Sequence, residues 1–180
     1  MLQIVIPARE LFDEVKQEFI YTKEQTLQLE HSLVSLSKWE SKWNKPFLTN
    51  RAKTREETID YIRCMTITQN VRPEVYYNIT QENIEQVYEY INAPMTATTF
   101  SEVEGKKINR ETTTSELIYY WMVALQIPFE CQKWHLNRLI TLIRVCNIKN
   151  QPDKKRNTKS TLNHYAALNA ARKAKLKSRG

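Results

Sequence analysis

Apolar and polar residues alternate with a period of two near the N-terminus, which is typical of half-buried strands. In the last such segment Leu27, Leu29 and His31 alternate with Gln28 and Glu30. Pro7 ends the first one. We therefore predict a small antiparallel sheet of three or four strands. The predicted strands are 2–6 (LQIVI), 18–22 (EFIYT) and 26–32 (TLQLEHS).

From residue 33 onward the apolar residues recur at helical spacing, which predicts a bundle of about five helices. Thr54 and Glu57 form one capping-box pattern, and Thr113 and Glu116 form another. Thr80 opens a segment whose apolar residues fit the i, i+3, i+4, i+7 pattern. The predicted helices are 33–43, which Pro46 follows, and 54–65, 80–91, 114–126 and 131–147.

The helix at 131–147 has an unusually wide apolar face. On a helical wheel its apolar residues cover about half of the circumference, and they are Cys131, Leu136, Leu139, Ile140, Leu142, Ile143 and Cys146. We expect the helices at 114–126 and 131–147, which IPFE joins, to form a central antiparallel hairpin. The wide face then packs on 114–126 and 80–91, and any exposed remainder forms a groove for a partner.

Positive charge is concentrated at the C-terminal end. Residues 149–180 hold ten Lys and Arg against one acidic residue, Asp153, whereas residues 1–148 carry a net charge of −2. This asymmetry indicates one domain with an appended tail, and the predicted strands and helices make it an α+β domain. It comprises a β-sheet region at 1–32, a helical body at 33–150 and a basic tail at 151–180, which can form a weakly amphipathic helix. The polar segment 95–112 fits a loop or a hairpin.

Composition excludes several classes of protein. The only glycines are Gly105 and Gly180, so a glycine-rich phosphate loop is excluded. The longest apolar stretch, 117–129, is shorter than a membrane-spanning helix. The chain opens without a recognisable signal peptide. We therefore expect no membrane association, and an intracellular setting with three reduced, buried thiols (Cys64, Cys131 and Cys146).

Candidate chemistry is sparse. Cys131 and His135 have the i, i+4 spacing of paired metal ligands, but a second pair is missing, and we expect His135 to be a core histidine. Acidic residues are scattered over helix starts and polar faces, where they suit the helix dipole. We therefore expect a non-enzymatic protein without a metal or cofactor. An acid–base pair assembled only by the fold is the alternative that the sequence leaves open.

The candidate residues for partner binding fall into an aromatic group and a basic group. Trp39 and Trp43 lie one helical turn apart and are flanked by Lys38, Lys42 and Lys45. Core packing and anchoring of a partner protein both fit these rings. The basic tail suits a solvated segment or an acidic protein better than nucleic acid, because it has one aromatic residue for stacking. The candidates are Trp39, Trp43, Phe47, Lys154, Lys155, Arg156, Arg172, Lys173, Lys175, Lys177 and Arg179.

Six blocks of the sequence resemble small morphogenesis proteins of tailed bacteriophages, most of all a group associated with tail assembly chaperones. These blocks are LSKWESKWNKPFL (36–48), YIRCM (61–65), PMTAT (94–98), ELIYYWM (116–122), IPFECQKWHLNRLITLIRVC (127–146) and LNAARKAKLKSRG (168–180). The resemblance spans nearly the whole chain, and its blocks reflect fold and surface rather than catalysis.

This resemblance implies a non-enzymatic protein of the host cytoplasm. Such chaperones hold the long, helical tape measure protein soluble until tail tube subunits assemble around it, and they are absent from the virion. Two alternatives remain. One is a structural virion component, such as a tail-end or connector subunit, and the other is a nucleic-acid-binding accessory protein that uses the basic tail.

Overall fold

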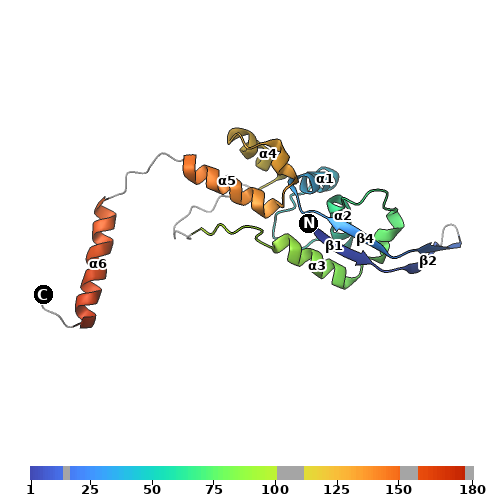
Figure 1. Ribbon diagram of the computed structural model, residues 1–180, viewed down its shortest axis with the longest axis horizontal. Coiled ribbons are helices and arrows are strands. Elements are labelled where there is room, and N and C mark those ends of the chain that lie inside the picture. The colour runs from blue at the N-terminus through green and yellow to red at the C-terminus, as the bar shows by residue number, and fades with distance from the viewer. Residues whose placement is uncertain (14–16, 101–111, 151–157, 177–180) are drawn as a thin grey trace. The chain divides into compact units, whose positions relative to one another are not determined.

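The computed structural model describes residues 1–13, 17–100, 112–150 and 158–176. It is an α+β protein with antiparallel strands at the N-terminus and helices after them, as predicted (Figure 1). The chain forms two compact units, Met1–Val145 and Cys146–Gly180, and each is considered by itself. The strands are β1 (Leu2–Ile6), β2 (Arg9–Asp13), β3 (Glu18–Thr22) and β4 (Gln25–Leu29).

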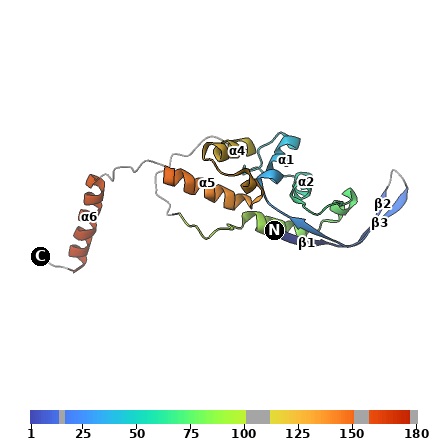
Figure 2. The same cartoon turned by 45° about the horizontal axis from the view of Figure 1, so that its top comes forward.

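The strands form one long hairpin rather than the single sheet of three or four strands that we predicted. β1 pairs with β4, and β2, which the sequence did not predict, pairs with β3. One register runs through both ladders, since Ile6 faces Gln25 and Arg9 faces Thr22. Pro7 lies between the ladders and lacks an amide hydrogen. The β2–β3 part projects away from the rest of its unit (Figures 1 and 2).

Side-chain caps set the starts of the helices. The predicted capping box of Thr54 and Glu57 is confirmed at α2. At α4 the cap is Thr114 rather than Thr113, and its hydroxyl accepts a hydrogen bond from the Leu117 amide. The predicted helix at 131–147 is divided, because Trp134 has an extended backbone. The helices are α1 (Leu33–Trp43), α2 (Arg55–Met65), η1 (Pro73–Asn78), α3 (Gln81–Asn92), α4 (Ser115–Ala124), η2 (Phe129–Lys133), α5 (Leu136–Asn150) and α6 (Thr158–Leu176), of which η1 and η2 are 3-10 helices.

Helix α1 is the centre of the helical part. It packs against α2, α4 and η2, whereas any direct contact between α4 and α5 is slight in the described part of the chain. The expected central hairpin of 114–126 and 131–147 is therefore wrong. The polar start of α5 is instead fixed to the end of α3, because the Asn137 amide donates to the carbonyls of Ile91 and Ala93 over 2.9 and 2.8 Å.

The wide apolar face of α5 is only partly used by the core. Leu136, Leu139 and Ile143 are buried, whereas Ile140 and Leu142 are partly exposed and Ile148 is exposed. The apolar residues of β1 and β4 that face inward are fully buried, and β1 packs against α3 and η1. The core therefore covers one side of α5 near its start. Toward the end of the helix fewer of its apolar side chains are buried.

Candidate functional site

Two of the three aromatic candidates for partner binding lie in the core. Trp39 is fully buried, and its indole N–H donates to the backbone carbonyl of Glu57 over 2.9 Å. Phe47 is buried and stacks on Tyr61 with ring centroids 3.8 Å apart. Their rings are therefore not available to a partner in this conformation, which agrees with core packing for Trp39.

Trp43 lies at the surface one turn further along α1. Its indole N–H donates to Asp60 over 2.8 Å, and the same carboxylate pairs with Lys42. The ammonium group of Lys45 lies 5.4 Å from the centre of the Trp43 ring, within the range of a cation–π contact. Trp43 is thus the one aromatic candidate of the three that keeps an accessible ring, since its side chain is partly exposed.

Two buried carboxylates accept hydrogen bonds from the segment between α1 and α2. Glu57 accepts hydrogen bonds from Arg51 and Lys45 and from the backbone of Thr54, and these bonds lower the pKa of its carboxyl to about 2. Glu40 accepts from the backbone amides of Phe47 and Ser115 over 2.8 and 2.7 Å. Both carboxylates have structural partners on each oxygen, so they act as connectors between segments of the fold.

The histidines His31 and His135 lie together in the core. His31 Nδ1 is 2.6 Å from the Tyr61 hydroxyl, and the rings of His31 and His135 are 5.1 Å apart. Burial, followed by the nearby His135, lowers the pKa of His31 to about 3. Burial also lowers the pKa of His135, whose Nε2 lies 3.1 Å from the Tyr90 carbonyl. His135 is therefore a buried core histidine, as expected.

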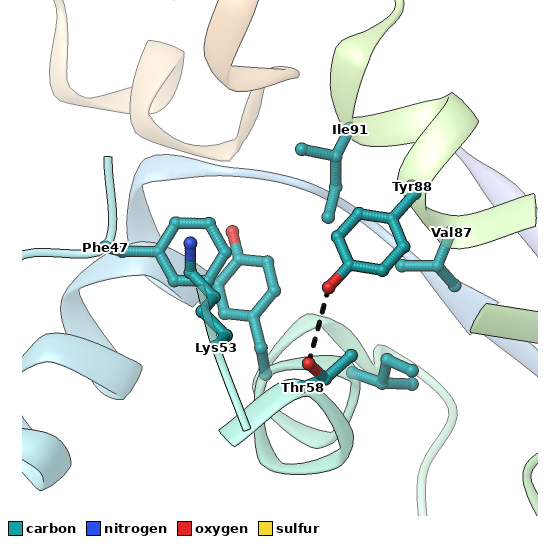
Figure 3. Close-up of a pocket in the computed structure, with 8 residues that line it drawn as sticks. Phe47, Lys53, Thr58, Val87, Tyr88 and Ile91 are labelled. Atoms are coloured by element: carbon teal, nitrogen blue, oxygen red, sulfur yellow. Dashed lines mark hydrogen bonds between the residues drawn. The ribbon is translucent and has the colours of Figure 1, made fainter. Parts of the chain in front are cut away.

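A small cavity lies between α2 and α3. Its volume is about 10 Å³, and it is lined mainly by apolar groups, among them Phe47, Val87 and Ile91 (Figure 3). The Lys53 ammonium group lies over the Phe47 ring, 4.2 Å from its centre, and partial burial lowers the pKa of Lys53. This space accommodates one water molecule at most, so it is not a site for a small-molecule substrate.

No metal centre is formed within the described ranges, since no group of three or more His, Cys, Asp or Glu side chains there has a suitable arrangement. The thiol of Cys131 is buried, and the pKa of the partly buried Cys64 is raised to about 11 by burial. Cys64 is thus protonated at neutral pH, which makes it a poor nucleophile.

The surface of α4 is the clearest candidate for binding. Its sequence, SELIYYWMVA, is the most apolar of the helices, yet only Ser115, Ile118 and Met122 of its ten residues are buried. Tyr120 and Val123 are 65% and 60% exposed, and Phe129 in the following η2 turn is 53% exposed. We call these three side chains the α4 surface. Tyr120 and Val123 lie about one helical turn apart, and exposed apolar side chains on one helix face are typical of protein-binding surfaces.

A second group of exposed aromatic rings lies on the projecting β2–β3 hairpin. Phe12 faces Phe19 across the ladder with ring centroids 5.0 Å apart, and Tyr21 lies two residues further on the same face. We call Phe12, Phe19 and Tyr21 the aromatic arm. Sequence analysis missed it because it did not predict β2, although the residues around Phe12 and Phe19 are arranged symmetrically about residues 15 and 16.

The basic candidates are only partly described. Arg172, Lys173 and Lys175 are exposed on α6. The side chains of Lys154, Lys155, Arg156, Lys177 and Arg179 lie outside the described residues. The described candidates are thus divided between the two units, so the structure does not bring the aromatic and basic groups together into one site.

Comparison with known proteins gives no match to a family model, a curated protein or a solved structure. Among the described helices, none combines the length and the apolar character needed to cross a membrane. A functional proposal for this chain therefore rests on its exposed surfaces.

Proposed function

We propose that this chain is a non-enzymatic tail assembly chaperone or scaffolding factor of a tailed bacteriophage. It acts in the host cytoplasm by covering an apolar helical segment of a long partner such as the tape measure protein. The exposed α4 surface is the observation that carries this proposal. The resemblance of the sequence blocks to phage morphogenesis proteins supports the choice of partner.

The α4 surface suits the apolar face of an amphipathic helix. Such a helix presents side chains at positions i, i+3, i+4 and i+7, and Tyr120, Val123 and Phe129 offer rings and a branched aliphatic group against which those side chains pack. Leu117, Trp121 and Leu125 are partly exposed on or next to α4 and extend the apolar area. Binding therefore needs no covalent step, only removal of apolar area from water.

Co-expression with a candidate tape measure protein tests the proposal directly. We expect the full chain to keep that partner in the soluble fraction, and the double variant Tyr120→Ser/Val123→Ser to lose this effect without a change in thermal stability, because both side chains are exposed. Ile67→Ser is the matched control, since Ile67 is exposed outside α4 and η2. Equal activity of the double variant and the wild type would contradict the proposal.

Recovery of the tagged chain from infected cells, with and without nuclease, separates the alternatives. A chaperone is recovered with one long helical phage protein and is missing from purified particles. Presence in mature particles would indicate a structural virion component instead. Recovery of nucleic acid alone, lost when Arg172, Lys173 and Lys175 are replaced by Gln, would indicate the nucleic-acid-binding alternative.

A further inference from the structure

We propose that α6 binds duplex DNA by lying in its major groove, with basic side chains on the phosphates of both strands. Helix α6 belongs to the unit Cys146–Gly180, whereas the α4 surface belongs to the unit Met1–Val145. DNA binding is therefore a second activity of the chain, which goes beyond the proposed function and uses different residues.

The charge of α6 and of the sequence on both sides of it has one sign. From residue 154 to residue 180 the sequence holds nine Lys and Arg and no Asp or Glu. A helix that is only solvated commonly carries both signs of charge, because i, i+4 pairs of opposite charge support it. Basic residues near the end of α6 suit the helix dipole, but the dipole does not account for the lack of acidic residues along all 19 residues of the helix.

The basic side chains of α6 are available to a partner. Residues 165–173 and Lys175, which are the part of α6 whose side chains are described, are all exposed. Among the described residues, no carboxylate forms an ion pair with Arg172, Lys173 or Lys175. Lys and Arg side chains that neutralise phosphates release the counterions condensed on the nucleic acid, which favours binding. The surface of α6 is thus complementary to a polyanion.

The three described basic side chains spread over one half of the helix. At about 100° per residue, Lys173 lies about 100° to one side of Arg172, and Lys175 lies about 60° to the other side. Alanines occupy the opposite half, among them Ala167 and Ala170. The two lysines therefore extend toward opposite sides with the arginine between them, as is needed to reach phosphates on both walls of a groove.

B-form DNA is the polyanion that fits this arrangement. Its major groove is about 12 Å wide and admits an α-helix, whose diameter with side chains is about 10–12 Å. The major groove of A-form RNA is too narrow for a helix. Single strands bind by stacking of bases on aromatic side chains, and Tyr165 is the only Phe, Tyr or Trp of α6. Groove binding to a duplex needs no such stacking.

Fluorescence anisotropy of a labelled DNA duplex of about 20 base pairs and mixed sequence, titrated with the full chain at several salt concentrations, tests the proposal. We expect binding that weakens as the salt concentration rises. The variant Arg172→Gln/Lys173→Gln/Lys175→Gln should raise the dissociation constant about tenfold or more. It should also reduce the slope of log affinity against log salt by about one for each lost phosphate contact.

The matched control is Arg9→Gln/Lys23→Gln/Arg72→Gln, which removes the same charge from exposed positions of the other unit and should leave DNA binding nearly unchanged. Ala170→Pro tests the helix itself, because proline interrupts α6 and keeps every charge. It should weaken binding about as much as the triple α6 variant, with circular dichroism to verify that the rest of the chain is folded.

Each contrary outcome is distinct. An unbound duplex, equal effects of the two triple variants, or unchanged affinity in Ala170→Pro would overturn the proposal. So would equal or tighter binding of the single strand or of an RNA duplex of the same sequence. Tighter binding of polyglutamate than of DNA at the same salt concentration would assign α6 to an acidic protein instead.

The two binding surfaces can be tested separately. Tyr120→Ser/Val123→Ser should bind DNA as the wild type does and lose only the solubilisation of the tape measure protein. The triple α6 variant should show the reverse. Loss of DNA binding in Tyr120→Ser/Val123→Ser would overturn the assignment to α6, whereas failure of solubilisation by the wild type would contradict only the proposed function.

Discussion

His31 and Tyr61 share a hydrogen bond inside the core, with 2.6 Å between the imidazole Nδ1 and the phenol oxygen. His31 follows β4, and Tyr61 belongs to α2, so this bond connects the hairpin to the helical part. Burial raises the pKa of Tyr61 above its usual value and lowers the pKa of His31 to about 3. The folded protein thus holds a neutral imidazole and a neutral phenol at physiological pH.

Acid should destabilise the protein through His31. The unfolded chain takes up a proton on this residue near pH 6.5, whereas the folded chain does not until about pH 3. The free energy of unfolding therefore falls as the pH decreases from about 6.5 toward 3, by up to about 1.4 kcal/mol per pH unit for this one group. Urea unfolding between pH 7 and pH 5 measures the slope.

His31→Gln should reduce that slope while keeping a hydrogen-bonding group near Tyr61, and the slope that remains is expected from His135, whose pKa burial also lowers. The carboxyl of Glu57, whose lowered pKa of about 2 also makes folding sensitive to acid, contributes only below about pH 4.5 and so does not obscure the comparison. The control is His164→Gln in α6, outside the unit that holds His31 and Tyr61. An unchanged slope in His31→Gln would show that His31 is not the group responsible.

Glu40→Gln should destabilise the fold by about 1–3 kcal/mol. The carboxylate of Glu40 uses one oxygen for the Phe47 amide and the other for the Ser115 amide. A glutamine offers one oxygen and one NH₂ group, so one buried backbone donor loses its acceptor. Chemical denaturation provides the measurement, and Glu89→Gln on the exposed side of α3 should change stability by less than about 0.5 kcal/mol. Equal effects of the two variants would contradict the connecting role of Glu40.

Local signals predicted most of the fold, because they depend on residues close in sequence. Alternation of Leu27, Leu29 and His31 was confirmed by their burial, and Thr54 with Glu57 was confirmed as a capping box. The β2 strand escaped prediction because its sequence, RELFD, places Leu11 and Phe12 next to each other and so lacks the period-two alternation of a half-buried strand. The position of α5 depends on hydrogen bonds from Asn137 to the end of α3, which no local pattern reveals.

The candidate binding surfaces were harder to predict, because sequence does not distinguish a buried ring from an exposed one. Trp39 and Trp43 occupy equivalent places in the helical pattern, yet only Trp43 is partly exposed. The difference arises from Phe47, whose ring centre lies 5.0 Å from that of Trp39 and which the chain folds back over α1. Tyr120 likewise belongs to the most apolar helix and remains largely exposed.

Replacing the two tryptophans of α1 should separate core from surface. Trp39→Ala removes a fully buried ring and should lower the free energy of unfolding by about 3–5 kcal/mol. Trp43→Ala removes a partly exposed ring and its hydrogen bond to Asp60, and should cost about 1 kcal/mol. Denaturation with urea compares them. A cost for Trp43→Ala as large as that for Trp39→Ala would mean that Trp43 is also a core residue.

Substitution of the neighbouring threonines Thr113 and Thr114 should identify the N-cap residue of α4. Thr114→Ala removes the hydroxyl that accepts from the Leu117 amide, and should destabilise the protein by about 1 kcal/mol. Thr113→Ala is the matched control, because Thr113 precedes the cap and its loss leaves that hydrogen bond in place. Thermal unfolding of the two variants gives the comparison. A larger effect at Thr113 would place the cap where the pattern of Thr113 and Glu116 predicted it, and α4 would then begin one residue earlier.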